Sequence, residues 1–446
     1  MGRWNDEDEE RKQDQHEMPH KRAKQANADA AVAGLVAQVR QAHSSSSNCV
    51  RLTGASTTTD LQTTKINNKD ADIPLNSTSK KYNPLVSGCR SVECYEPLNF
   101  IDQGTFGEVF RAKCLDTGGI YAIKKVKLGS SSTSKYGFPI TALREANILL
   151  TLNHPSIVKV KEIVIGSTVD KVYMVMEHGG KDMKDVMFLL QKSSGDGSAF
   201  SLGQVKQLMG QLLSAVAYMH KHWYIHRDIK TSNLLYKPET GRLTICDFGL
   251  ARRYGDPTHA LTVEVVTLWY RAPELLLGDR KYDSAVDVWS CGCVLGELLT
   301  GQALFPGQGE ADEVHLIRAL LGTPDEPSWA GVTSKVNYPA MLGNKLTNQS
   351  NSSGTGTDSS NSSSGASVPN IELHGIRQRF HRATCHGAGR AVLFLSVRGC
   401  ELMASLLRYD PVKRMPARQA LDHAWFGEDP HPTSAALMPR YMPSVE

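Results

Sequence analysis

Two short segments of the chain carry residue types suited to phosphoryl transfer. The stretch that ends at Asn233 reads HRDIKTSN, and Asp247 opens an Asp-Phe-Gly triplet fourteen residues later. The Asp228 carboxylate can take a proton from a hydroxyl, the Asp247 carboxylate can hold a metal ion, and Lys230 can neutralise a phosphate. Because phosphoryl transfer depends on position and charge more than on covalent chemistry by the protein, this set predicts that reaction.

The bulk composition is that of an ordinary soluble protein. The chain has 446 residues, 40% hydrophobic and 22% charged, which is enough for two or three domains. A net charge of +4 is too small to indicate a nucleic-acid partner. Nine cysteines without a spaced framework indicate reduced thiols, as in the cytosol or nucleus. No apolar run approaches the roughly 18 residues that span a bilayer, so we expect no membrane contact.

Three segments differ in composition from the rest of the chain. Residues 1–94 pass from an acidic to a basic cluster and then to Ala-rich and Ser/Thr/Asn-rich stretches. Such a segment has too little apolar surface to offset its ordering entropy, so we expect disorder there. The basic cluster could serve as a short nuclear import signal. We expect residues 342–368 to form a flexible surface insertion and residues 429–446 to form a C-terminal tail.

Hydrophobic periodicity predicts an α+β fold with two lobes. Residues 95–178 predict a small, mostly antiparallel sheet with one helix, and residues 179–428 predict a large helical lobe. The strands are expected at 108–111, 120–126, 157–165 and 172–176, with the helix at 141–152. In the second lobe, helices are expected at 202–221, 284–299, 311–321 and 399–407.

A hairpin before the strand at 120–126 supplies candidate nucleotide contacts. It resembles the glycine-rich loop of protein kinases, in which backbone amides cover the phosphates of ATP. Asp102 stands where that pattern has its first glycine, so taken alone the segment could be an ordinary hairpin turn. The resemblance implies contacts with ATP from Ile101, Asp102, Gln103, Gly104, Thr105, Phe106, Gly107 and Val109.

Two charged residues downstream strengthen this interpretation. Lys124 follows Ala-Ile in a predicted strand and would hold the α- and β-phosphates of ATP. Lys125 points to the opposite face of that strand, where we expect a solvated lysine. Glu145, in the first predicted helix, is the expected ion-pair partner of Lys124.

The chain from about Tyr95 to Phe426 resembles a eukaryotic serine/threonine protein kinase. Pro139–Glu145 reads PITALRE, similar to the helix by which cyclin-dependent kinases bind a cyclin, and Thr267–Glu274 reads TLWYRAPE, also similar to that family. Gly-Phe-Pro before the helix, Arg-Arg-Tyr-Gly after the Asp-Phe-Gly triplet and Thr-Ser-Asn in the HRD segment resemble the PITSLRE group, which also lacks the first loop glycine. PITALRE is equally the spelling of a transcription-elongation kinase, and this alternative stays open.

The resemblance implies a role for each catalytic residue. Asp228 would be the base that orients and accepts the proton of the substrate hydroxyl, and Lys230 would contact the γ-phosphate. Asn233 and Asp247 would hold two Mg²⁺ ions through hard oxygen ligands. At the adenine pocket the resemblance implies Met176 and the hinge residues Glu177 and Gly179, with Asp182 at the ribose.

The same resemblance implies a regulatory switch. Thr262 occupies the place of the activating phosphothreonine, and Arg144, Arg227 and Arg252 match the three arginines that gather round it. A cyclin would bind through Pro139–Glu145.

Substrate preference is implied by two further positions. Val266 and Arg271 match residues that favour proline after the phosphorylated residue, so Ser-Pro and Thr-Pro sites are expected. Phe106 stands where many relatives have an inhibitory tyrosine, so that modification is excluded at this position.

Further positions are expected to be structural. Glu274 and Arg414 resemble a buried ion pair that anchors the activation segment, Asp247–Glu274. Asp287 resembles a residue that braces the backbone of the catalytic loop, His226–Asn233. The thiols of Cys291 and Cys293 lie in an apolar helix and are expected in the core.

Three readings of the function remain. The first is an active cyclin-dependent serine/threonine kinase acting in the nucleus, in transcription, RNA processing or cell-cycle control. The second is an inactive kinase fold that serves as a scaffold; the presence of the whole catalytic set argues against it. The third is a nucleic-acid binder using the basic N-terminal cluster, which is too short and has no interleaved aromatic residues.

Overall fold

The computed structural model describes residues 88–104, 107–126, 140–166, 171–194, 199–254, 266–342, 371–380 and 394–441. The expected disorder before residue 88 and the expected insertion after residue 342 therefore lie outside the described residues. The chain divides into two compact units. Unit 1 comprises Met1–Pro139 and Val160–His178, and unit 2 comprises Ile140–Lys159 and Gly179–Glu446. Each unit is described by itself.

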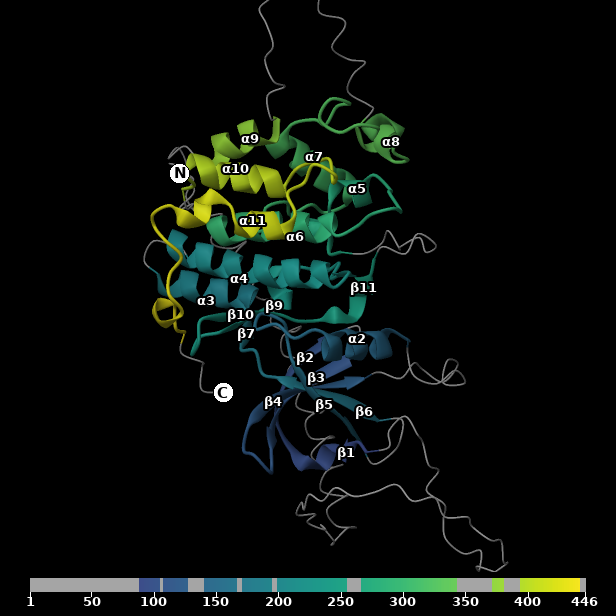
Figure 1. Cartoon of the computed structure of the whole chain (residues 1–446), viewed down its shortest axis with the longest axis vertical. Helices are drawn as coiled ribbons and strands as arrows, with labels where there is room; N and C mark the ends of the chain where they lie inside the picture. The colour runs from purple at the N-terminus through teal and green to yellow at the C-terminus, as the bar shows by residue number, and fades with distance from the viewer. Residues whose placement is uncertain are drawn as a thin grey trace, which may run out of the picture. The chain divides into compact units, whose positions relative to one another are not determined.

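Unit 1 is built on a six-stranded sheet with strand order β1-β5-β6-β4-β3-β2. Every pairing is antiparallel except that of β1 with β5. Figure 1 shows the labelled strands of this sheet. The strands are β1 (Arg90–Ser91), β2 (Tyr95–Gly104), β3 (Gly107–Cys114), β4 (Ile120–Val126), β5 (Val160–Ile165) and β6 (Val172–Glu177). The predicted, mostly antiparallel sheet is thus present, and β4 has the predicted bounds.

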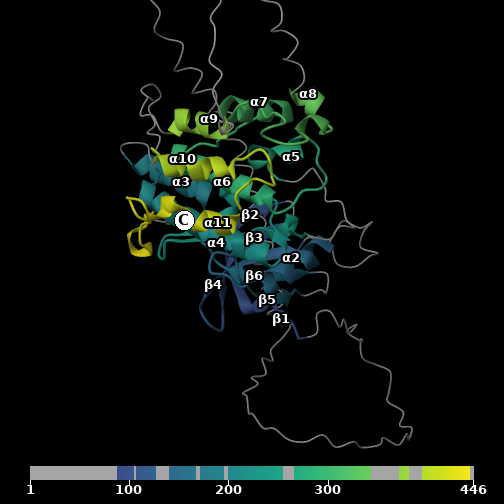
Figure 2. The ribbon, with the colours of Figure 1, turned by 45° about the horizontal axis from the view of Figure 1, so that its top comes forward.

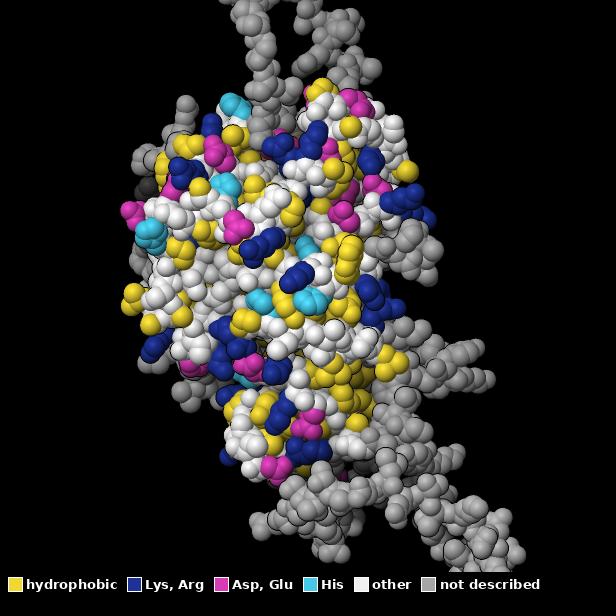
Figure 3. All heavy atoms as spheres, in the orientation of Figure 1, with side chains coloured by type: hydrophobic (Ala, Val, Ile, Leu, Met, Phe, Trp, Pro, Cys, Tyr) yellow, Lys and Arg dark blue, Asp and Glu magenta, His cyan; other side chains and the backbone are white. Residues whose placement is uncertain are grey.

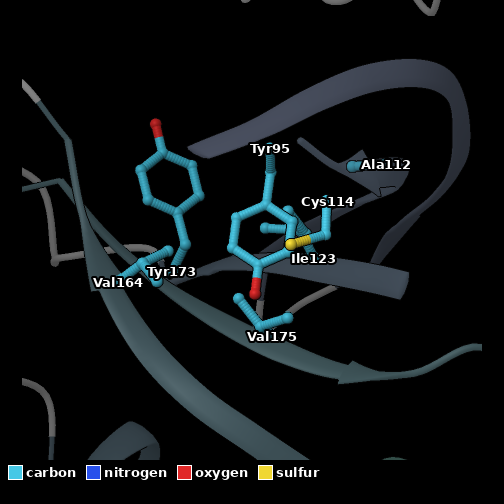
Figure 4. Packing of buried hydrophobic residues seen from close by; sticks show 7 residues of the cluster. All are labelled: Tyr95, Ala112, Cys114, Ile123, Val164, Tyr173 and Val175. Carbon is cyan, nitrogen blue, oxygen red and sulfur yellow. The ribbon is translucent and has the colours of Figure 1, made fainter. Parts of the chain in front are cut away.

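The core of unit 1 follows from alternation along these strands. On β3, Ala112 and Cys114 are buried while Arg111 and Lys113 are exposed, because successive side chains point to opposite faces. Figure 4 shows the inward side chains gathered round the Tyr95 ring. The cluster consists of Tyr95, Ala112, Cys114, Ile123, Val164, Tyr173 and Val175. The hydroxyl of the buried Tyr95 needs a hydrogen-bond partner, and it donates to Glu162 Oε1 at 2.5 Å.

Unit 2 is mainly helical. Its helices are α2 (Ile140–Thr151), α3 (Met183–Ser193), α4 (Leu202–Lys221), α5 (Pro273–Leu276), α6 (Ala285–Thr300), α7 (Glu310–Leu321), α8 (Tyr338–Leu342), α9 (Ile371–Phe380), α10 (Val397–Leu406) and α11 (Ala417–Leu421). Short strands accompany them: β7 (Lys181–Asp182), β8 (Tyr224–Ile225), β9 (Leu234–Lys237), β10 (Arg242–Ile245) and β11 (Arg252–Arg253). Figure 2 shows α10 beside α6, consistent with the packing between these helices.

Helix α6 forms the centre of unit 2. Every residue from Val286 to Leu299 is buried, including Cys291 and Cys293, as expected for core thiols. Burial raises the pKa of both thiols well above the usual value. None of the described helices is both long and apolar enough to cross a membrane. On the face seen in Figure 3, basic and acidic side chains are interspersed over the described residues.

All the predicted elements are present, but the strand predicted at 108–111 extends over Gly107–Cys114 as β3, the helix predicted at 399–407 is Val397–Leu406, and two other predictions also differ from the structure. The strand expected from residue 157 begins at Val160, because Ile157 forms an isolated parallel bridge with Ile245. The helix expected in the β-rich lobe is present as α2, but it groups with unit 2, where it packs against the 3₁₀ turn Phe248–Leu250. Helix α4 has the predicted bounds, and Ser201 and Gln204 close a capping box at its start.

Candidate active site

The Asp228 carboxylate lies at the centre of a hydrogen-bonded cluster in unit 2. Its Oδ2 atom accepts from Asn233 Nδ2 at 2.8 Å and lies 2.9 Å from Lys230 Nζ. Its Oδ1 atom accepts from the Thr267 hydroxyl at 2.9 Å and from the Thr267 N–H at 3.2 Å. The predicted base, the predicted phosphate-binding lysine and one predicted metal ligand therefore lie together.

The electrostatics of the cluster keep Asp228 ionised. Burial, the largest cause, acts to raise the pKa of Asp228, but the charge and hydrogen bond of Lys230, the charge of His226 and the hydrogen bond of Thr267 together lower it below its usual value. Lys230 Nζ also donates to the Thr267 hydroxyl at 2.9 Å. An ionised carboxylate beside a cation is the state that a proton acceptor requires.

The backbone of this loop is held by Asp287, as the sequence predicted. The Asp287 carboxylate accepts from the N–H groups of His226 and Arg227, both at 2.9 Å. Its Oδ2 atom also lies 3.0 Å from His220 Nε2. Arg227 has φ of 66°, a conformation that costs a non-glycine residue about 1–3 kcal/mol, so these bonds stabilise an otherwise unfavourable loop.

Asp247 follows β10 and lies at the same end of the β9–β10 hairpin as Asn233. The pairing of Leu234 with Ile245 ends the ladder, and the Cys246 N–H then donates to the Asn233 carbonyl at 3.0 Å. Asp247 has the left-handed φ of 60°. The next residue, Phe248, packs edge-on against His226, with ring centroids 4.8 Å apart.

The donor set of Asn233 and Asp247 fits Mg²⁺. Asn233 Nδ2 donates to the backbone oxygen and to Oδ2 of Asp228, so its Oδ1 is the atom left to face a cation. A carboxylate and an amide oxygen are the hard ligands that Mg²⁺ prefers. When bound, Mg²⁺ would neutralise phosphate charge at this end of the hairpin.

Unit 1 holds the predicted nucleotide-binding lysine. Lys124 lies on β4 between Val109 of β3 and Met174 of β6 in register, and it is buried. Lys125 was expected only in solvent; it is partly exposed, and its Nζ lies 3.1 Å from Glu108 Oε2 on β3. Lys124 and Glu145 belong to different units, so their ion pair stays a prediction.

The predicted glycine-rich loop is a hairpin between β2 and β3. Gly104 pairs with Gly107, and Thr105 and Phe106 lie outside the described residues. A Cβ added to Gly107 would lie 2.2 Å from the Lys125 carbonyl oxygen, so the approach of β3 to β4 requires glycine there. Asp102 pairs with Val109 in the strand without positive φ, which explains why this position accepts a residue other than glycine.

Comparison with known proteins decides the family. The protein kinase domain family matches residues 95–426, which include parts of both units and every residue of the Asp228 cluster. The chain belongs to the protein kinase family. This match confirms the expected α+β, bilobal kinase fold. The strands of the six-stranded sheet come first along the chain, and most of the helices follow them.

The curated relatives place this kinase among the cyclin-dependent kinases. Cyclin-dependent kinase G-2 of Oryza sativa subsp. indica is 42% identical over 362 residues, covering 80% of this chain and 45% of the relative. Cyclin-dependent kinase 11.1 of Caenorhabditis elegans is 44% identical over 359 residues, covering 80% and 44%. Cyclin-dependent kinase 11B of Rattus norvegicus is 41% identical over 369 residues, covering 83% and 74%. The kinase thus spans less than half the length of the rice and nematode relatives, and the predicted similarity to the PITSLRE group is confirmed.

The three predicted phosphate-binding arginines influence one another. Burial, together with the positive charges of Arg227 and Arg144, lowers the pKa of Arg252 to about 10. Arg227 is buried and donates to the Leu250 carbonyl at 2.8 Å and to the Tyr282 hydroxyl at 2.7 Å. Thr262 lies outside the described residues. The three arginines come from α2, the catalytic loop and β11, and their positive charges together can bind an anion such as a phosphate.

Val266 and Arg271 are in direct contact. Val266 has φ of 69°, and Arg271 donates to its carbonyl from Nε at 3.4 Å and from a terminal nitrogen at 3.1 Å. Arg271 also lies 2.6 Å from Glu310. The Val266 carbonyl therefore already has donors in the kinase itself.

The predicted anchor of the activation segment is present. Arg414 donates to both carboxylate oxygens of Glu274, at 2.7 and 2.9 Å, and both side chains are buried. Arg414 further donates to the carbonyls of Arg408, Tyr409 and Ala285. The pair thereby links α5 to α6 and to the segment after α10.

At the end of the hinge, Gly179 and Asp182 have local structural roles. A Cβ on Gly179 would lie 2.6 Å from Leu235, so the chain passes close to β9 there. Asp182 caps α3 by accepting from the Asp185 N–H at 3.0 Å. The contacts predicted for Glu177, Gly179 and Asp182 with ATP remain predictions.

Sequence reasoning missed one member of the cluster, Thr267. This residue contacts both Asp228 and Lys230. Thr267 is the first residue of the TLWYRAPE motif, but the motif by itself indicates only the family and not a contact with Asp228. A buried triad of Thr231, Tyr270 and Glu297 was also missed; the Tyr270 and Thr231 hydroxyls donate to Glu297 at 2.6 and 2.9 Å.

Proposed function

We propose that this chain is an active, cyclin-dependent serine/threonine protein kinase that transfers the γ-phosphate of ATP to Ser-Pro and Thr-Pro sites. The single observation that carries the proposal is the Asp228 carboxylate held between Lys230 and Asn233, 2.9 Å from Lys230 Nζ and 2.8 Å from Asn233 Nδ2. An inactive scaffold would not need to keep this set intact.

The reaction follows from the roles of these side chains. Asp228 accepts the proton of the substrate hydroxyl as its oxygen attacks the γ-phosphorus, and the bond to ADP breaks. Lys230, 2.9 Å from Asp228, offsets the charge of the transferred phosphoryl group. Lys124 contacts the α- and β-phosphates. Thr267 donates to Asp228 Oδ1 and so orients the carboxylate for the incoming hydroxyl.

The proline preference is supported by the Val266 carbonyl. Arg271 already donates to this carbonyl, so it is a poor acceptor for the amide of the residue that follows the substrate Ser or Thr. An unpaired amide is costly, and proline has none to satisfy. This reading predicts a large preference for proline after the phosphorylated residue.

Two activating events are proposed. A cyclin binds through Pro139–Glu145 and so positions Glu145 for its ion pair with Lys124. A phosphate on Thr262 binds Arg144, Arg227 and Arg252, whose mutual repulsion it relieves. The names of the relatives, all cyclin-dependent kinases, support the first event. Nuclear localisation and a role in transcription, RNA processing or the cell cycle are part of the same proposal.

The test is affinity capture of the full chain from cells that express it, with identification of the bound cyclin. The captured complex is then given Mg-ATP and paired peptides that differ only in Pro or Ala after the phosphorylated Ser. The proposal expects a cyclin in the complex and transfer to the Pro peptide alone. Full activity of the chain without a cyclin contradicts cyclin dependence, and no transfer by the complex supports the scaffold.

A further inference from the structure

The chain continues beyond the kinase family match at residue 426 and packs against other parts of unit 2. We call residues 427–441 the tail segment. Lys206 Nζ on α4 donates to the Glu428 carbonyl at 2.6 Å. The Thr433 N–H donates to the Gly203 carbonyl at 2.9 Å. In Figure 1 the tail segment is the yellow trace that runs beside α4 and α3 toward β7.

Further along, the tail segment is fixed at the β9–β10 turn. Met438 is buried, and a Cβ added to Gly241 would lie 2.8 Å from both Met438 and the Ala435 carbonyl oxygen. Gly241 also has φ of 61°, so glycine is required there for both conformation and space. The turn and the tail segment therefore fit closely.

The tail segment ends on β7, the strand that follows the hinge. The Tyr441 hydroxyl accepts from the Lys181 N–H at 3.2 Å and donates to the Tyr236 carbonyl at 3.3 Å. In return, the Tyr236 hydroxyl donates to the Pro439 carbonyl at 2.8 Å. The two tyrosine rings are 6.4 Å apart. One side chain of the tail segment thus bonds to two strands, β7 and β9.

The position of β7 decides where Asp182 lies. Lys181 and Asp182 are the whole of β7 and pair with Tyr236 and Leu235 of β9. Before them, Gly180 leaves no room for a Cβ, which would lie 2.1 Å from the Tyr236 carbonyl oxygen. So short a strand has few bonds of its own, and the Tyr441 hydroxyl adds one directly beside Asp182.

We infer that Tyr441 is a positioning residue for nucleotide binding, which holds β7, and with it Asp182, through the Lys181 amide. The inference rests on the proposed function, in which Asp182 contacts the ribose of ATP. Burial raises the pKa of Tyr441, so its hydroxyl stays protonated and able both to donate and to accept. The affinity for ATP then depends on the contact between the tail segment and β7.

The test compares the full chain with Tyr441→Phe, which removes only the hydroxyl. Leu437→Ala is the matched control, because Leu437 lies in the same segment and is 73% exposed. Calorimetric titration with Mg-ADP measures nucleotide affinity without turnover. Hydrogen exchange of the Lys181 amide measures the hydroxyl contact itself, and thermal unfolding reports general stability.

The inference expects Tyr441→Phe to speed exchange at Lys181 and to raise the Kd for Mg-ADP by about fivefold, the typical effect of one hydrogen bond. Leu437→Ala should match the unsubstituted chain. Faster exchange with an unchanged Kd overturns the positioning role, as does unchanged exchange or an equal change of Kd in Leu437→Ala. If the unsubstituted chain binds no Mg-ADP, the proposed function is wrong. Hydrogen exchange at Lys181 then still shows whether the Tyr441 hydroxyl bonds to the Lys181 amide.

Discussion

Asn233 is bonded twice to Asp228 through one amide nitrogen, which donates to the backbone oxygen and to Oδ2, both at 2.8 Å. The same residue is a candidate Mg²⁺ ligand through its other side-chain atom. One amide group therefore orients Asp228 through its nitrogen and leaves its Oδ1 atom to face a bound Mg²⁺. If Asn233 holds Mg²⁺ as we propose, metal binding and the orientation of the base depend on the same side chain.

Replacing Asn233 with Ala should weaken Mg²⁺ binding and remove the hydrogen bonds from Asn233 to the Asp228 backbone oxygen and Oδ2. We expect the Mg²⁺ concentration for half-maximal phosphoryl transfer to rise about tenfold or more, the usual cost of losing a metal-site group. Removing divalent ions with a chelator should abolish transfer in both proteins. The measurement is the rate of transfer against Mg²⁺ concentration. Asn99→Ala, at an exposed position on β2, is the control and should behave as the unsubstituted chain.

The Glu274–Arg414 pair should be costly to break. Arg414→Ala leaves the Glu274 carboxylate buried without its cation, and we expect unit 2 to lose about 3–5 kcal/mol of stability. Urea denaturation followed by tryptophan fluorescence measures the change. Arg418→Ala removes an exposed ion pair and should change stability by less than about 0.5 kcal/mol. Equal effects of the two substitutions would mean that the buried pair has no special role.

The sequence predicted most of the fold and of the site because the relevant signals are local. The apolar pattern predicted α4 and β4 to the residue, and the HRD and Asp-Phe-Gly segments predicted the cluster round Asp228. Contacts that join distant segments were less visible. The bridge from Ile157 to Ile245 shortened a predicted strand, and Tyr441 lies 260 residues after its partner Lys181. No periodicity within either segment marks such a pairing.

Glu313 should make stability depend on pH. This residue is fully buried, and its Oε2 accepts from the Gly307 N–H at 3.0 Å. Burial raises the pKa of Glu313 to about 8 from an ordinary 4.5. Because the pKa of Glu313 is higher in the folded state, its protonated form contributes to the free energy of unfolding. This contribution is complete below pH 4.5 and is lost as the pH rises toward 8. Glu313→Gln should remove this dependence, so its melting temperature should exceed that of the unsubstituted chain increasingly as the pH rises through that range.

A matched carboxylate separates this effect from a general charge effect. Glu401 is partly exposed, so Glu401→Gln should leave the pH profile of the melting temperature unchanged. If Glu313→Gln and the unsubstituted chain keep parallel profiles from pH 5 to pH 8, then Glu313 is not the titrating group.

Thr262 and the arginine cluster should act as one unit. Thr262→Ala and Arg252→Ala should each lower kcat of the cyclin-bound kinase, by an amount between about 5-fold and about 150-fold. The kcat of the double variant should equal that of the less active single variant, because both changes remove the same phosphate contact. Steady-state kinetics measure the three variants, with Thr240→Ala, at an exposed loop position, as the control. Fully multiplicative losses would show that the two residues act independently.

We propose that Asp228 is the catalytic base of this protein kinase. The most direct measurement is the single-turnover rate of γ-phosphate transfer by Asp228→Asn in complex with the captured cyclin, together with its affinity for Mg-ADP. We predict a rate lower by about a thousandfold with little change in Mg-ADP affinity, since Asn has nearly the shape of Asp but cannot accept the proton, and ADP lacks the γ-phosphate that Lys230 would contact. Transfer by Asp228→Asn at the rate of the unsubstituted kinase would contradict it.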